Sequence, residues 1–176
     1  MCFTLRLHTS AAPPRGGLTQ ALGPMRQIFF ATVVFFAFGT ALATEPSLVS
    51  DKELSLGGIA LDDTEAVVLR KLGEPRRTTD TGEFLNIRMD YHGLTVWLGE
   101  GRRVGEVLST LKQHCTPAGI CPGMSFAKAK EKYGPPLVAD REDGIFMEYP
   151  SSLSACWLQI AVSKGIVKSV RAECQP

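Results

Sequence analysis

Histidine is scarce in this sequence, and no familiar signature of an enzyme active site is present. Of the three histidines, only His92 and His114 follow the N-terminal leader described below. The chain contains no G-x-S-x-G pattern, no phosphate-binding glycine loop and no H-E-x-x-H pattern. Asp62 and Asp63 are adjacent acids, but they precede a predicted helix, where negative charge favours the helix dipole. The sequence therefore predicts a protein that is not an enzyme and uses no cofactor.

An excess of charge of either sign is also missing. The chain has 19 Lys and Arg residues against 18 Asp and Glu residues. Three of the basic residues belong to the leader, so 16 of the 19 remain beside all 18 acidic ones, a net charge of −2. Such a charge gives no electrostatic attraction to nucleic acid or to an anionic membrane surface. We expect neither as a partner.

Acidic residues are absent from the first 43 positions, which have the features of an export signal. An uncharged apolar stretch begins at Ile28, and the segment ends in Ala41-Leu42-Ala43. A basic start, an apolar middle and a small-x-small end are typical of a secretory signal peptide. We predict a signal peptide over residues 1–43, with Met25 as an alternative start. Cleavage would leave a periplasmic or secreted protein that begins at Thr44.

A membrane anchor is not expected after cleavage. The apolar stretch is shorter than the roughly 18–20 residues of a membrane-spanning helix, although a retained N-terminal anchor is the alternative. No cysteine follows Ala43 directly, which argues against a lipid anchor.

A sequence pattern that occurs twice organises the rest of the chain. Residues 59–75 and 120–136 both begin with Ile and end in Gly-x-Pro. Thr64 and Ser125 occupy matching helix-start positions, and Gly73 and Gly134 occupy matching helix-end positions. Each copy therefore predicts a short helix. Runs rich in β-branched and apolar residues follow each helix and predict strands at 83–91, 94–98, 104–108, 144–149, 155–162 and 166–173.

These elements predict an α+β fold made of a tandem repeat. Each copy would pack short helices on a three-stranded antiparallel meander, an ααβββ-like unit. The predicted boundaries are an N-terminal tether or weak helix at 44–56, a first repeat at 57–110 and a second repeat at 111–176. Residues 163–165 are interpreted as a three-residue hairpin loop in the second repeat.

Four cysteines remain after the leader, and an even number in an exported chain indicates disulfides. We favour Cys115–Cys121, which would close the loop before the second helix, and Cys156–Cys174, which would join the last two strands. A three-residue loop would place Cys174 opposite Ser154, so the second pairing conflicts with the expected register. Zinc bound by His114, Cys115 and Cys121 is the alternative, but the spacing matches no common ligand pattern, and we predict no metal.

Strand alternation predicts a candidate binding face. Aliphatic residues of the predicted strands share one side, and both tryptophans lie on the other, which the helices would leave uncovered. Trp and Arg are the residues that most often anchor protein interfaces. The alternative is that each Trp is covered as core, because Trp is usually largely buried. The predicted partner-binding residues are Asn86, Arg88, Trp97, Trp157, Gln159 and Arg171.

The repeated helix followed by a meander resembles the β-lactamase-inhibitor-protein-like (BLIP-like) fold, which small outer-membrane assembly proteins of the SmpA/OmlA type share. The resemblance covers residues 56–174 and is closest at Gly123-Met124-Ser125. The first copy departs from it, with Asp62-Asp63-Thr64 where glycine and an apolar residue would be expected. The resemblance implies a saddle whose concave sheet face holds another protein. The assembly proteins usually have one repeat and a lipid anchor, whereas this sequence predicts two repeats and none.

Together these observations predict an exported, disulfide-bonded, non-catalytic protein. Its expected partner is another protein, held on the open sheet face, and its expected role is that of an inhibitor or immunity-type protein for an envelope or secreted protein. The alternative is an assembly or structural factor of the envelope.

Overall fold

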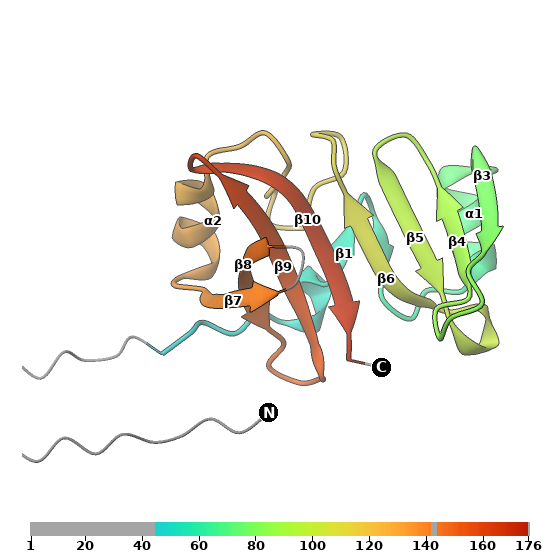
Figure 1. Ribbon diagram of the computed structural model, residues 1–176, viewed down its shortest axis with the longest axis horizontal. Helices are drawn as coiled ribbons and strands as arrows, with labels where there is room; N and C mark the ends of the chain where they lie inside the picture. The colour runs from blue at the N-terminus through green and yellow to red at the C-terminus, as the bar shows by residue number, and fades with distance from the viewer. Residues whose placement is uncertain (1–44, 142–143, 176) are drawn as a thin grey trace, which may run out of the picture. The chain divides into compact units, whose positions relative to one another are not determined.

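One antiparallel sheet of eight strands forms most of the fold (Figure 1). The computed structural model describes residues 45–141 and 144–175, so the predicted signal peptide and Thr44 lie outside the described residues. The strand order is β3-β4-β5-β6-β10-β9-β8-β7, and every neighbouring pair is antiparallel. The strands are β3 (Arg77–Asp80), β4 (Ile87–Asp90), β5 (Leu94–Leu98), β6 (Val104–Ser109), β7 (Leu137–Arg141), β8 (Gly144–Pro150), β9 (Cys156–Ser163) and β10 (Ile166–Cys174).

The predicted α+β fold of tandem ααβββ-like units is wrong, because the protein is mainly β. In the described ranges the α-helices are α1 (Glu65–Leu72) and α2 (Phe126–Tyr133), one in each half rather than several. Four strands follow each helix instead of three, and all eight join in a single sheet. The unpredicted strands, β3 and β7, are the two edges of that sheet, and β3 is short, polar and largely exposed.

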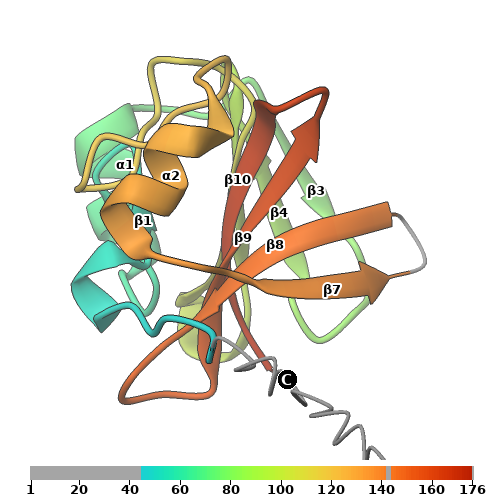
Figure 2. The same ribbon diagram turned by 90° about the vertical axis from the view of Figure 1, so that its left-hand side faces the viewer.

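Both α-helices begin and end at the positions that the repeated pattern predicts. Ser125 Oγ accepts a hydrogen bond from the N–H of Ala127 at 3.3 Å, whereas Thr64 makes no side-chain cap. Gly73 and Gly134 adopt φ values of 76° and 83°, a left-handed backbone that ends a helix and suits glycine. Both helices lie on the same side of the sheet (Figure 2).

The segment before α1, for which the sequence predicts a tether or a weak helix at 44–56, packs against the sheet. Val49, Leu54 and Leu56 are buried in the core, and the N–H of Val49 donates to the carbonyl of Pro150. The segment contains a short 3-10 helix, Asp51–Glu53, and the hairpin of β1 (Ser55–Leu56) and β2 (Ile59–Ala60). β1 contacts β6 and β10, on the side of the sheet that carries the helices. The N-terminal segment therefore covers the centre of the sheet.

The hydrophobic core lies between the sheet and these covering elements. Alternate side chains of β5, Leu94, Val96 and Leu98, are essentially inaccessible to solvent. On β9, Leu158 and Ile160 are equally inaccessible to solvent. The opposite face of the sheet, which carries the intervening side chains and which neither helix covers, is called the open face below.

The last hairpin has a different turn from the predicted one. β9 and β10 are joined by the two residues Lys164 and Gly165, both at positive φ, with Ser163 opposite Ile166. A bulge between Val167 and Ser169 then shifts the register by one more residue. These two changes bring Cys174 opposite Cys156, where they form a disulfide. The second disulfide joins Cys115 and Cys121, so the structure contains both of the pairings favoured from the sequence.

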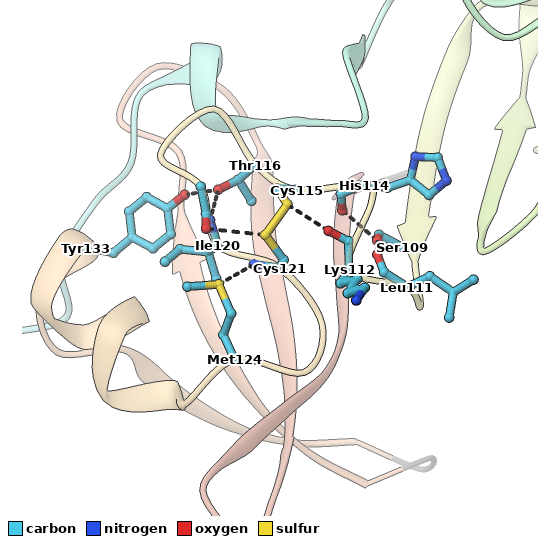
Figure 3. Close-up of a disulfide and its surroundings, with 11 residues drawn as sticks. Ser109, Leu111, Lys112, His114, Cys115, Thr116, Ile120, Cys121, Met124 and Tyr133 are labelled. Atoms are coloured by element: carbon cyan, nitrogen blue, oxygen red, sulfur yellow. Dashed lines mark hydrogen bonds between the residues drawn. A yellow bond between two sulfur atoms is a disulfide. The ribbon is translucent and has the colours of Figure 1, made fainter.

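The loop that carries Cys115 and Cys121 is fastened to the core by a chain of hydrogen bonds (Figure 3). The Thr116 hydroxyl lies 2.7 Å from the hydroxyl of Tyr133 and accepts from the N–H of Ile120. The Tyr133 hydroxyl in turn donates to the Glu53 carboxylate at 2.7 Å. Burial raises the pKa of Tyr133, so this phenol stays protonated as a donor. The connection between the two halves is therefore held to both α2 and the N-terminal segment.

A pair of glycine substitutions tests the packing of this connection. Gly93 has φ +72°, and a Cβ at this position would lie 2.4 Å from Leu111 Cγ, whereas Gly82 has φ +70° and open space around it. Gly82→Ala should lower the free energy of unfolding by about 1–2 kcal/mol through backbone strain alone. Gly93→Ala should lower the free energy of unfolding by ~1–3 kcal/mol more than Gly82→Ala does, because the added Cβ would clash with Leu111. Equal losses for both variants in urea denaturation would contradict the close approach of Leu111.

Candidate functional site

A row of side chains crosses the open face from β4 to β9. The register makes Arg88 the partner of Trp97, and Trp97 the partner of Glu106. Glu106 is the partner of Glu173, and Glu173 is the partner of Trp157. These five residues, on β4, β5, β6, β10 and β9, are called the central row. Directly opposite residues of an antiparallel pair have neighbouring side chains, so the two tryptophans flank two adjacent carboxylates.

Both tryptophans are half-buried, and each contacts a charged side chain. The Arg88 guanidinium lies 5.4 Å from the centroid of the Trp97 ring, a cation–π distance. Arg88 Nε also donates to Asp90 Oδ1 at 2.9 Å. The indole N–H of Trp157 donates to Glu173 Oε1 at 2.8 Å. The rings are therefore fixed in place on the open face, and they are not part of the core beneath the helices.

The two carboxylates share one guanidinium. Arg171 Nε lies 3.3 Å from Glu106 Oε1, and Arg171 Nη1 lies 3.6 Å from Glu173 Oε2. The side chains of Glu106 and Glu173 are only 15% and 17% exposed. Arg171 Nε is buried without a hydrogen bond in the described part of the chain, so its contact with Glu106 is an ion pair without hydrogen-bond geometry. Two acids and one base leave this cluster with an excess of negative charge.

Burial raises the pKa of Glu106 above its usual range. Loss of solvent is the main cause, and the neighbouring Glu173 charge adds to it, while Arg171 and Arg88 act in the opposite direction. Ionisation of Glu106 therefore lowers the stability of the folded protein. Groups whose pKa is shifted by burial and by a specific charge partner cluster at functional sites.

A pocket of about 280 Å³ opens beside the central row. Trp97, Glu106 and Glu173 lie on its sheet side, and Phe84 and Leu85 of the β3–β4 loop contribute an apolar wall. Leu85 fits there because position 105 is glycine, where a Cβ would come within 2.4 Å of Leu85 Cδ2. Phe84 is 67% exposed at the pocket.

The structure brings together four of the six residues that the sequence proposed for partner binding. Trp97, Trp157 and Arg88 belong to the central row, and Arg171 contacts both of its carboxylates. Gln159 is on the same face but only 5% exposed, and it donates to Glu148 at 3.1 Å. Asn86 is exposed in the loop before β4.

Gln159 belongs to a second, more deeply buried polar group on the open face. Glu148 is 3% exposed and accepts two hydrogen bonds of 2.9 Å from Arg141 Nη2. Gln159 hydrogen-bonds to this pair and offers little surface to a partner, so its role in partner binding stays a prediction.

Glu106, Glu173, Phe84 and Leu85 were missed as site residues by the sequence analysis. Simple alternation would put Glu106 on the same face as Val104 and Leu108, and the register shift between Trp97 and Leu98 against β6 turns it to the open face. The sequence also does not show that Glu173 will be its neighbour. That contact depends on the pairing of β6 with β10, which lie in different halves of the chain. Leu85 lies before β4 begins at Ile87, so the longer strand predicted at 83–91 would have turned it into the core.

No group of three or more His, Cys, Asp and Glu side chains within the described residues is arranged to hold a metal ion. Among the helices that the structure describes, none is long and apolar enough to cross a membrane. The two disulfides are typical of proteins that have left the reducing cytosol.

Comparison with known proteins assigns no family. No protein-family model matches the chain, and no curated protein matches it. Among solved structures, an extracellular protein containing an SCP domain from Bacillus anthracis has 14% identity and a TM-score of 0.49, over 77% of this chain and 49% of that one. The chain thus spans about half the length of that protein.

Two further solved structures are similar at the same level. A DUF4309 family protein from Bacillus subtilis has 15% identity and a TM-score of 0.48, over 67% of this chain and 83% of that one. A cysteine-rich secretory protein from Staphylococcus aureus has 13% identity and a TM-score of 0.45, over 65% of this chain and 43% of that one. At these scores the likeness assigns neither a family nor an activity. None of the three descriptions names a β-lactamase inhibitor protein or an SmpA/OmlA protein, so that resemblance stays a prediction.

Substituting Glu106 tests the electrostatic account of the central row. Because the pKa of Glu106 is higher in the fold than in the unfolded chain, its ionisation lowers stability. This loss is absent below the unfolded pKa, grows as pH rises and is complete above the folded pKa. Glu106→Gln should therefore raise the melting temperature near neutral pH, and the gain should shrink towards about pH 4.

The matched control is Glu131→Gln, which removes the same charge from an exposed position on α2. It should leave the melting temperature nearly unchanged across the same pH range. A lower melting temperature for Glu106→Gln at neutral pH would show that the ion pair with Arg171 outweighs burial.

Proposed function

We propose that this chain is an exported, non-catalytic protein-binding module that holds another protein on its open face. The partner is an envelope or secreted protein met in the periplasm or outside the cell, and the binding acts as that of an inhibitor or immunity-type protein. The observation that carries the proposal is the central row. It presents Trp97 and Trp157 together on the one face of the sheet that neither helix covers.

The composition of the central row supports a protein partner. Tryptophan and arginine are enriched among the residues that contribute most to protein–protein affinity, particularly where they are partly enclosed by neighbours. Trp97, Trp157 and Arg88 are positioned by contacts within the chain before any partner arrives. Side chains that are already ordered lose less conformational entropy on binding.

The two disulfides that brace the sheet and the connecting loop also support a protein-binding role. The sheet is cross-linked by Cys156–Cys174 beside Trp157 and Glu173, and the loop between the halves is closed by Cys115–Cys121. A rigid face can bind a partner without rearrangement of the backbone, which is common in inhibitor complexes.

Affinity capture tests this function. The mature chain from Thr44 should capture a single soluble protein from envelope or secreted fractions in stoichiometric amount. Trp97→Ala and Trp157→Ala should each weaken that complex by about 2 kcal/mol, or roughly thirtyfold in Kd. The captured protein can then be assayed for inhibition.

Two controls make the capture decisive. Leu48→Ala also removes an exposed large apolar side chain, 60% exposed and outside the central row, and should bind as the parent does. Circular dichroism of each variant establishes that it is folded. Undiminished capture by both folded Trp variants would contradict the proposal, and capture of outer-membrane assembly complexes would support the assembly role instead.

A further inference from the structure

We infer that the pocket beside Trp97 receives one basic side chain, an arginine or a lysine, that projects from the protein partner. This inference rests on the proposed protein-binding function and names the chemistry that the partner brings to the open face. It follows from the charge, size and wall of the pocket.

The charge of the pocket is negative. Three carboxylates line it, those of Glu83, Glu106 and Glu173, and its described lining contains no lysine or arginine. Arg171, from outside this lining, is shared between Glu106 and Glu173 and so offsets only one of the charges. Arg88 also acts on Glu106, but its own charge is paired with that of Asp90. The Glu106 carboxylate accepts no side-chain hydrogen bond from the described residues, whereas the Glu173 carboxylate accepts one from Trp157. A cationic donor that reaches Glu106 would meet a partly desolvated acceptor, where a charge-assisted hydrogen bond is strong.

The size of the pocket fits one side chain. Its volume of about 280 Å³ lies just below the ~300–1,000 Å³ of pockets that enclose small-molecule ligands. The position of the pocket, on the same face as both tryptophans, places it within the surface that a docked protein would cover.

The wall of the pocket fits the stem of a long basic side chain. Phe84 and Leu85 provide apolar surface against which methylene groups can pack while the charged end reaches the carboxylates. Trp97 provides an aromatic ring that already has a guanidinium against it, that of Arg88 at 5.4 Å. The face of an aromatic ring attracts cations through its quadrupole.

Titration of the intact mature protein with small capped amino acids tests the inference. The probes are N-acetyl-arginine methylamide and N-acetyl-lysine methylamide, and the neutral control is N-acetyl-citrulline methylamide, which has nearly the shape of arginine. The readout is the indole N–H resonance of Trp97 in a ¹⁵N-labelled sample. Both cationic probes should shift this resonance saturably, and citrulline should not.

Matched variants assign the effect to the pocket. Glu106→Gln should weaken binding of the arginine probe about tenfold, because it removes one charge-assisted acceptor. Glu131→Gln removes an equal charge from α2 and should leave binding unchanged. Equal weakening by both variants would show a response to net charge only and would overturn the inference, as would equal shifts by citrulline and arginine.

The captured partner separates this inference from the proposed function. If the partner is lost in the Trp97→Ala and Trp157→Ala variants and is also weakened by Glu106→Gln, the basic side chain enters the pocket. If the tryptophan variants lose the partner but Glu106→Gln binds it as the parent does, the open face is the binding surface and the pocket inference is wrong. If neither tryptophan variant loses the partner, the proposed function itself is wrong.

Discussion

The pairing of β10 with β6 on one side and β9 on the other determines everything that the open face presents. β10 joins the two halves of the sheet, so its register decides which residues of the first half meet which residues of the second. Without the bulge at Lys168, Trp157 would lie opposite Ala172 instead of Glu173. The Cys156–Cys174 disulfide joins directly paired residues next to this position and holds the register that the bulge creates. A slip of one residue would turn every side chain of β10 to the other face.

The same register concentrates charges that a purely structural sheet would avoid. Like charges directly opposite on antiparallel strands are destabilising, yet Glu106 and Glu173 are such a pair and both are largely buried. Arg171 compensates them only in part. The fold can hold this arrangement because its core lies on the other face, where Val107 and Ala172 are fully buried next to these acids in the chain. Packing on the core face therefore offsets the electrostatic cost of the two acids on the open face.

The sequence predicted those features that depend on neighbours in the chain. Helix ends at Gly73 and Gly134 follow from glycine's freedom at positive φ, and alternation placed Trp97 and Trp157 on the face away from the helices. Edge strands β3 and β7 were missed because β3 has no apolar alternation and both are exposed. Without them, the two halves looked like separate three-stranded units.

The central row could not be predicted because it depends on pairing between distant residues. Two register shifts, between Trp97 and Leu98 against β6 and between Val167 and Ser169 against β9, bring its members into line. Sequence alternation tells which face a residue is on, but it does not tell which residue lies opposite. For the same reason the conflict that the sequence raised for Cys156–Cys174 disappears once the two-residue turn and the bulge are known.

Cross-saturation NMR on the complex of the labelled chain with its captured partner tests the central claim most directly. Irradiation of the partner should attenuate the indole N–H signals of Trp97 and Trp157 and the amides of the central strands β5, β6, β9 and β10. Amides of α1, α2 and the β1–β2 hairpin, on the opposite side of the sheet, should keep their intensity. Attenuation confined to the helices with unchanged indole signals would contradict the account, because the partner would then lie on the face that the central row does not reach.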